Sequence, residues 1–319
     1  MIKQKINIGL GTAAIGRPQY INLRQEAAEE FSLEEFKEHG WLMLDEAYRK
    51  GIRYFDTAPG YGLAEQLLID WIKEKKYSDV EIATKWGYTY VANFNLNAII
   101  HEVKEHSLTK LNQQWEQSKS LLPYLSSYQI HSATLDSGIL ENKEILSRLG
   151  ALKAEYGLLI GLTTSGSNQT EIIKKSLEIE IGGEGLFDVF QVTYNLLDQS
   201  LCELKKTLFA QKKRIVIKEA LANGRLFPNP NYPQYAQLYQ YLQTLAAKYK
   251  VGVDAIALRF CTDSIQPFMV LSGASNKRQI TENLEATKLK LEENEISSLK
   301  QFSVAPEQYW KERKRLGWN

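Results

Sequence analysis

The sequence has only two cysteines, no long apolar run and almost no net charge. Two cysteines in 319 residues, Cys202 and Cys261, are too few for a disulfide framework, so a reducing cytoplasm is the expected location. No apolar run approaches the ~18 residues of a membrane span, and residues 1–5 lack the apolar region of a signal peptide. A formal net charge of +1 gives no electrostatic reason to expect binding to nucleic acid or to an anionic membrane.

Two common kinds of site are also poorly represented. The four histidines show no paired spacing of the kind that metal-dependent hydrolases use; they are His39, His101, His106 and His131. Gly9 and Gly11 follow the first expected strand, but no later glycine and no downstream acid complete a dinucleotide fingerprint. This pattern speaks against a Rossmann domain.

Short apolar runs alternate with longer helical patterns along the chain, and hydrophobic residues make up 44% of it. The expected strands are residues 5–10, 53–55, 80–84, 127–130, 158–162, 189–193, 214–218 and 268–271. The expected helices are residues 33–49, 64–74, 108–121, 141–155, 169–177, 235–250 and 277–287. This alternation predicts a closed parallel (β/α)₈ barrel, a fold that reaches ~250 residues or more as one domain.

No linker, repeat or low-complexity segment divides the chain, so we expect one domain over residues 1–319. Residues 253–261 are expected to form an additional helix. The polar residues 291–319 are expected to form an extension that packs outside the barrel.

Four ionisable residues stand at or just after expected strands: Asp56, Tyr61, Lys85 and His131. A charge that leaves water is costly unless partners are supplied, so folding alone does not require these residues. The working face of such a barrel lies at the C-terminal ends of its strands. We therefore expect the four side chains to meet in one site, with a turn through Pro59 and Gly60 bringing Tyr61 inward.

These residue types predict acid/base chemistry on a carbonyl group. A tyrosine hydroxyl titrates near ~10, and a neighbouring ammonium such as that of Lys85 lowers this pKa by favouring the phenolate. A carboxylate such as that of Asp56 keeps the lysine charged and oriented, and a histidine positions the carbonyl oxygen or relays a proton. The set suits reduction of an aldehyde or ketone without a metal.

The same segments resemble the catalytic tetrad of the aldo-keto reductases, in that family's chain order. The tetrad segments are Asp56-Thr57-Ala58, Tyr61-Gly62 with Glu65, Thr84-Lys85, and Ile130-His131. Gly9–Thr12, Ser272–Ser275 and Glu282-Asn283 resemble further signatures, so the resemblance runs from about residue 8 to residue 286. It implies an NAD(P)-dependent oxidoreductase that reduces aldehydes or ketones, or oxidises sugars or alcohols. Tyr61 would be its general acid.

A cofactor site is expected where residues 273–278 open a helix after the eighth strand. Free backbone N–H groups at a helix start attract anions, and Lys277 and Arg278 add positive charge. The resemblance places the adenosine end of NAD(P) here and the nicotinamide at the fifth and sixth strands. The expected cofactor contacts are Gly11, Thr12, Thr163, Thr164, Gln191, Lys218, Leu221, Gly273, Ser275, Arg278, Gln279, Glu282 and Asn283.

The chain departs from the family pattern at three places on the cofactor side. Thr163-Thr164 stand where many members have Ser-Asn, and Lys218 begins a segment that often carries an aromatic ring stacked on nicotinamide. Either the cofactor is held less tightly or another ring, such as Tyr194, takes that place. Gln279 replaces a common arginine, so Arg278 must supply any contact with a 2′-phosphate. NADP(H) is predicted over NAD(H).

The substrate is expected to be a small carbonyl compound or a sugar, contacted by Trp86. Tyr88, Tyr90 and residues 15–23 are further candidates for the pocket wall, and residues 91–107 for a lid. Two alternatives remain open. One is a non-catalytic nucleotide-binding barrel that reports redox state to a partner; the other is a metal-dependent hydrolase or an aldolase, in which Lys85 forms a Schiff base. The complete tetrad favours the oxidoreductase.

Overall fold

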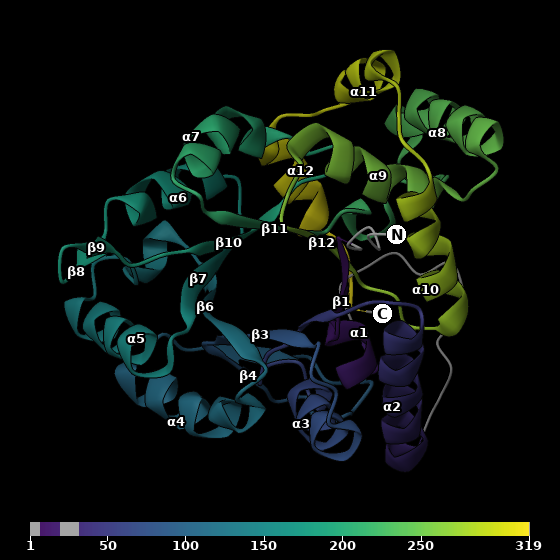
Figure 1. Ribbon diagram of the computed structural model, residues 1–319. Coiled ribbons are helices and arrows are strands. Elements are labelled where there is room, and N and C mark those ends of the chain that lie inside the picture. The colour runs from purple at the N-terminus through teal and green to yellow at the C-terminus, as the bar shows by residue number, and fades with distance from the viewer. Residues whose placement is uncertain (1–6, 20–31, 319) are drawn as a thin grey trace.

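The computed structural model describes residues 7–19 and 32–318. Parallel strands form a closed barrel, and helices surround it (Figure 1). The barrel strands are β1 (Ile8–Gly11), β2 (Tyr54–Asp56), β3 (Glu81–Trp86), β6 (Leu125–Ala133), β7 (Leu159–Thr164), β10 (Val189–Thr193), β11 (Arg214–Lys218) and β12 (Met269–Ser272). The barrel closes because β1 pairs with β2 on one side and with β12 on the other. The predicted (β/α)₈ fold is confirmed.

The outer layer consists of helices that follow the strands in the chain. They are α1 (Ala13–Gly16), α2 (Leu33–Arg49), α3 (Ala64–Lys75), α4 (Leu108–Ser118), α5 (Lys143–Tyr156), α6 (Gln169–Leu177), α7 (Lys205–Ala210), α8 (Ala236–Tyr249), α9 (Val253–Ile265) and α10 (Lys277–Leu284). Helix α2 begins with a capping box, in which Ser32 and Glu35 satisfy each other's backbone N–H groups. Helix α7 was not predicted, because six residues are too few to show a helical period.

The strands differ from the sequence prediction mainly at their C-terminal ends. β3 continues through Lys85 and Trp86, and β6 continues past His131. Strand pairing is a backbone property, so Lys85 still pairs with Gln129 although its own side chain is polar. The expected first strand, residues 5–10, lies partly outside the described residues.

The core has an inner and an outer part. Inside the barrel, Tyr54 and Met269 pack in a small cluster of buried side chains. A Cβ at Gly9 would lie only 2.8 Å from the Tyr54 ring, so the glycine makes room for that ring. Between the strands and the helices lies a much larger apolar cluster that includes Phe55 and Trp71. The barrel is therefore a filled core, and a site is expected at the C-terminal ends of its strands.

Two β-hairpins and a C-terminal tail, which begins at residue 291, are added to the barrel. β4 (Tyr88–Tyr90) and β5 (Glu102–Lys104) pair antiparallel, and β5 lies within the expected lid segment, residues 91–107. β8 (Glu180–Ile181) and β9 (Glu184–Gly185) form the other hairpin. The tail contains α11 (Glu293–Lys300) and α12 (Pro306–Arg313), and α12 lies beside the end of β11 (Figure 1).

The last part of the tail packs on one end of the barrel. The hydroxyl of Tyr309 in α12 donates to Glu219, which directly follows β11, and Trp318 packs against Arg17, which follows α1. Both partners stand in loops at the C-terminal ends of the strands. The last part of the tail therefore crosses this end of the barrel, because its aromatic side chains find buried partners there.

Cys202 is exposed and Cys261 is buried, and both are free thiols. The cytoplasmic location inferred from so few cysteines stays a prediction. Among the described residues, no helix has the length and apolar character needed to cross a membrane.

Candidate active site

An ion pair between Asp56 and Lys85 lies at the centre of the site. Lys85 Nζ donates to Asp56 Oδ2 at 2.6 Å and to the Thr57 carbonyl oxygen at 2.9 Å. Gln191 Nε2 donates to the other carboxylate oxygen, Oδ1, at 2.6 Å. Lys85 is 0% and Asp56 2% exposed. Burial raises the pKa of Asp56, while Lys85 and Gln191 lower it, so the carboxylate depends on these partners for its charge.

Tyr61 and His131 lie over this pair. Lys85 Nζ is 4.6 Å from the centre of the Tyr61 ring, and the Tyr61 hydroxyl is 3.4 Å from His131 Nε2. Burial, followed by the negative charge of Asp56, raises the pKa of Tyr61 well above its ordinary value. Burial, followed by the charge of Lys85, lowers the pKa of His131. At neutral pH the site therefore presents a phenol and a neutral imidazole.

A tight turn brings Tyr61 to this position. The Tyr61 backbone N–H donates to Ala58 O at 3.0 Å. Gly62 has a φ of +64°, and a Cβ there would lie 2.3 Å from the carbonyl oxygen of Gly16. A side chain at residue 62 would thus be strained and would push the turn away from the loop after β1. The expected inward swing of Tyr61 is what the structure has.

The structure brings all four predicted catalytic residues together. Asp56, Lys85 and His131 come from β2, β3 and β6, which are neighbours in the barrel. His131 is half-buried, whereas the other three are buried. Its ring also lies 4.7 Å from that of Tyr88 on β4. A hydroxyl, an imidazole and a buried ammonium in contact form an arrangement that can move a proton to or from a substrate oxygen.

The residues predicted at the nicotinamide end line neighbouring strand ends, and most of their polar groups have protein partners. Thr163 Oγ1 accepts from Ser132 N at 2.7 Å, and Thr164 Oγ1 donates to Gln169 Oε1 at 3.2 Å. Lys218 Nζ donates to Thr193 Oγ1 at 3.1 Å. A carboxamide bound at these strand ends would therefore have to share or replace these hydrogen bonds.

Three further residues predicted to contact the cofactor are buried or half-buried. Thr12 is 0% exposed, and both its N–H and its hydroxyl donate to the backbone carbonyl of Asp56. Thr12 therefore anchors the catalytic strand. Gly11 is half-buried at the end of β1, and Leu221 is half-buried against the core.

The start of α10 has the features expected for an anion site. Gly273 is exposed, and a Cβ there would meet no atom within 4 Å. Lys277 and Arg278 are exposed at the first turn, and Arg278 pairs with Glu282 at 3.1 Å. An exposed pair of this kind exchanges readily with water or a ligand. Open space beside two cations fits the phosphate groups of a nicotinamide dinucleotide.

The remaining residues predicted here shape the loop. Gln279 Oε1 accepts from Ser275 N at 2.8 Å, and Asn283 Nδ2 donates to Ser272 Oγ at 2.7 Å. Asn283 is only 3% exposed. These amides therefore fix the path of the loop from β12 into α10.

Two aromatic residues that the sequence singled out are buried in the structure. Trp86 is 0% exposed, its ring lies 5.4 Å from that of His106, and it packs in the large apolar cluster between the strands and the helices. Tyr194 stacks on Phe260 of α9, with ring centres 5.8 Å apart and planes 4° apart, and its hydroxyl donates to Ser264. The Tyr194 ring is therefore already stacked within the core and is not available to replace the missing nicotinamide-stacking ring.

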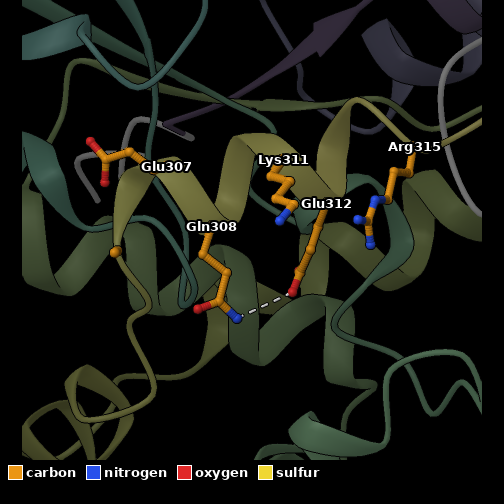
Figure 2. Close-up of a pocket in the computed structure, with 6 residues that line it drawn as sticks. Glu307, Gln308, Lys311, Glu312 and Arg315 are labelled. Carbon is orange, nitrogen blue, oxygen red and sulfur yellow. Dashed lines mark hydrogen bonds between the residues drawn. The ribbon is translucent and has the colours of Figure 1, made fainter.

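The sequence did not single out the charged residues that fasten the tail. Arg225 is 0% exposed; it donates to Tyr309 O at 3.0 Å and pairs with Glu312 at 3.4 Å. Figure 2 shows Gln308 and Glu312 meeting on one side of α12, at 3.3 Å. Tyr235 also donates to Glu312, at 2.6 Å. Contacts between residues far apart in the chain carry no periodic signal, so only the fold reveals these pairs.

Known proteins are similar to this chain in sequence. The model of the aldo/keto reductase family matches residues 7–304. The NADH-specific methylglyoxal reductase of Escherichia coli (strain K12) is 23% identical, over 82% of this chain and 86% of that protein. An uncharacterized oxidoreductase of Bacillus subtilis (strain 168) is 26% identical, over 81% of this chain and 85% of that protein.

Solved structures with the same fold are also similar. An aldo-keto reductase from Bacillus halodurans, in its holo form, superposes with a TM-score of 0.70 at 21% identity, covering 95% of both chains. The glycerol dehydrogenase of Gluconobacter oxydans superposes with a TM-score of 0.71 at 20% identity, covering 95% of this chain and 92% of that one. The family match spans nearly the whole chain and includes all four clustered residues. The chain belongs to the aldo/keto reductase family.

Proposed function

We propose that this protein is an NAD(P)H-dependent reductase of small aldehydes and ketones in which Tyr61 is the acid/base. The observation that carries the proposal is the position of the Tyr61 hydroxyl, within reach of His131 and above the Asp56–Lys85 pair. A buried ion pair of this kind is weak evidence for stability. Its place beneath a phenol supports a role in moving a proton.

In the proposed reaction, a nicotinamide cofactor held at this end of the barrel would supply the hydride that the carbonyl carbon receives. Tyr61 donates its hydroxyl proton to the carbonyl oxygen, which His131 Nε2 holds in place by a hydrogen bond. Lys85 favours the phenolate that remains, because an adjacent cation stabilises it. Asp56 keeps Lys85 charged and oriented, and Gln191 fixes the free oxygen of that carboxylate. Alcohol oxidation would follow the same steps in reverse.

We infer that the cofactor is NADP(H) in preference to NAD(H), with its phosphates beside Gly273. Support comes from the open space at Gly273 and from the cations of Lys277 and Arg278 at the start of α10. Arg278 would exchange Glu282 for a 2′-phosphate, a better partner because it carries more charge. The Escherichia coli relative is named as NADH-specific, so both cofactors have to be measured.

The substrate class that we propose is a short, polar carbonyl compound. The names of two relatives mention methylglyoxal and glycerol, which are both three-carbon compounds. In this chain, Tyr61, Tyr88 and the half-buried His131 leave a polar surface with aromatic walls. Such a surface supplies hydrogen bonds to oxygen atoms and stacking area for a small carbon skeleton.

The test is an assay with purified protein. NADPH or NADH is mixed with short aldehydes, ketones and sugars, and loss of the reduced nicotinamide absorbance is followed. We expect turnover with wild type and its near loss in Tyr61→Phe, with cofactor binding retained. Tight cofactor binding without turnover on any substrate would overturn the proposal and favour a nucleotide-binding barrel that reports redox state to a partner.

A further inference from the structure

Arg17 lies next to the candidate site although it is not one of the four clustered residues. Its side chain is 3% exposed. Nη1 donates to the Gly60 carbonyl oxygen at 3.1 Å and to Glu102 Oε2 at 2.7 Å. The guanidinium carbon is 5.4 Å from the centre of the Tyr61 ring. Arg17 therefore contacts the turn that carries Tyr61 and also the β5 strand of the hairpin.

The end of the tail shields this arginine from water. Trp318 lies over the guanidinium, with its ring centre 4.7 Å from the central carbon. Trp318 also stacks on His101, with ring centres 4.3 Å apart and planes 9° apart. A charge covered in this way acts through protein rather than through water, so its effect on a neighbour 5 to 6 Å away is weakly screened.

Several charged or titratable groups surround Tyr61. Burial has the largest effect and raises the pKa of Tyr61; Asp56 also raises it, Arg17 lowers it, and Glu102 and Tyr88 raise it. His131 faces the hydroxyl, and Lys85 lies under the ring. The charge of Lys85 is balanced by Asp56 at 2.6 Å. Arg17 is thus a second cation close to the phenol, and it comes from a different loop.

We propose that Arg17 is a positioning residue for the tyrosine acid/base: it fixes the turn at Gly60 and supplies a second positive charge that favours the Tyr61 phenolate, and Glu102 limits that charge. The inference rests on the proposed acid/base role of Tyr61. It assigns a function to the loop after β1, and it makes the cover formed by Trp318 part of the electrostatic environment of the reaction.

A purely structural role of Arg17 and an electrostatic role of Arg17 predict different results. If Arg17 only fastens the turn, Arg17→Lys and Arg17→Met both slow the reaction, and the pH at which it becomes active does not move. If its charge acts on Tyr61, Arg17→Met raises the apparent pKa of alcohol oxidation and Arg17→Lys restores it. Glu102→Gln moves this pKa in the opposite direction, because it removes a negative charge and leaves Arg17 in place.

The experiment measures kcat/KM for alcohol oxidation as a function of pH in these three variants. Arg49→Met, which removes an exposed arginine on α2, is the matched control. We expect Arg17→Met to shift the profile upward by about one pH unit and Glu102→Gln to shift it downward by a smaller amount. If Arg17→Met fails to fold, Arg17→Gln, which removes the same charge and keeps a hydrogen-bond donor for the Gly60 carbonyl oxygen, is measured in its place. Profiles of Glu102→Gln and Arg17→Met that coincide with wild type would overturn the inference.

A second readout separates this inference from the proposed function. Ionisation of Tyr61 is followed by ultraviolet difference spectroscopy, as the difference between each variant and the same variant carrying Tyr61→Phe. If Tyr61→Phe retains full turnover, the proposed function fails, yet a later ionisation in Arg17→Met would still support the effect of Arg17 on Tyr61. If Tyr61→Phe is inactive and neither readout moves in Arg17→Met, the proposed function stands and the role of Arg17 is wrong.

Discussion

The ammonium of Lys85 lies 4.6 Å from the centre of the Tyr61 ring. The same ammonium is bound to a carboxylate oxygen of Asp56 and to the carbonyl oxygen of Thr57. These two acceptors fix its direction, so the cation remains beneath the ring. The Tyr61 hydroxyl faces His131 instead. The phenol is thereby placed between a fixed positive charge and a neutral imidazole, an arrangement that favours proton release once a substrate oxygen approaches.

Removing the Tyr61 hydroxyl should abolish most of the activity. Tyr61→Phe deletes one oxygen atom and leaves the ring, so the packing against His131 and the cofactor site should persist. We expect the rate of carbonyl reduction to fall by ~10²–10⁴-fold, as is typical for loss of a general acid. Single-turnover kinetics and a cofactor binding titration check this. Near-normal turnover, with hydride transfer shown to limit the rate, would remove Tyr61 from the mechanism.

Replacing Lys85 should move the pH dependence as well as slow the reaction. In Lys85→Met the phenolate loses a nearby cation, so the pKa of Tyr61 rises and alcohol oxidation needs a more alkaline pH. The measurement is kcat/KM for oxidation across the alkaline range. Lys73→Met, at an exposed position on α3, is the matched control and should follow the wild-type profile. A slower variant with an unshifted profile would contradict the role of Lys85.

The sequence was sufficient to predict the barrel and the cluster of four ionisable residues. Strand alternation is a local pattern, and the C-terminal ends of parallel strands necessarily meet at one face. Asp56, Lys85 and His131 were therefore predictable neighbours once their strands were placed. Tyr61 followed from the turn at Pro59-Gly60.

The residues that enclose the site were not predictable in the same way. Arg17 lies within residues 15–23, which the sequence named as candidates for the pocket wall, but Trp318, near the other end of the chain, belongs to no predicted pattern. Their contact depends on where the tail ends relative to the barrel, which is a property of the whole fold. Trp86 follows Lys85 in β3, so the alternation of side chains along a strand places it on the opposite face, in the outer apolar cluster.

Arg278→Ala should distinguish the two cofactors. We expect NADPH to bind about tenfold more weakly, because one charge-assisted contact to a 2′-phosphate is lost. NADH lacks that phosphate, so its affinity should change little. Fluorescence titrations of both cofactors measure this, and Arg49→Ala, another exposed arginine, is the control. Equal weakening of NADPH and NADH would show that Arg278 does not discriminate between them.

Glu65 should make stability depend on pH near neutrality. It is 1% exposed, accepts a hydrogen bond from Thr84, and accepts another from Ser118 at 3.0 Å. Burial raises its pKa from 4.5 to about 7, although both hydroxyls and Lys85 lower it. The folded state therefore holds a proton that the unfolded state has already released between these two values. The contribution of Glu65 to stability therefore falls as pH rises through this window, and it no longer changes above the window.

Glu65→Gln removes this titration and keeps the size of the side chain. At 1.36 kcal/mol per pKa unit, the effect amounts to about 3 kcal/mol. Between pH ~5 and pH ~8 we therefore expect the free energy of unfolding of the variant to rise by up to this amount relative to that of wild type. Urea unfolding at both pH values measures the change, and other titrating groups cancel in the comparison. Glu74→Gln, exposed on the same helix, should parallel wild type; a Glu65→Gln variant that also did so would show that Glu65 titrates in its ordinary range.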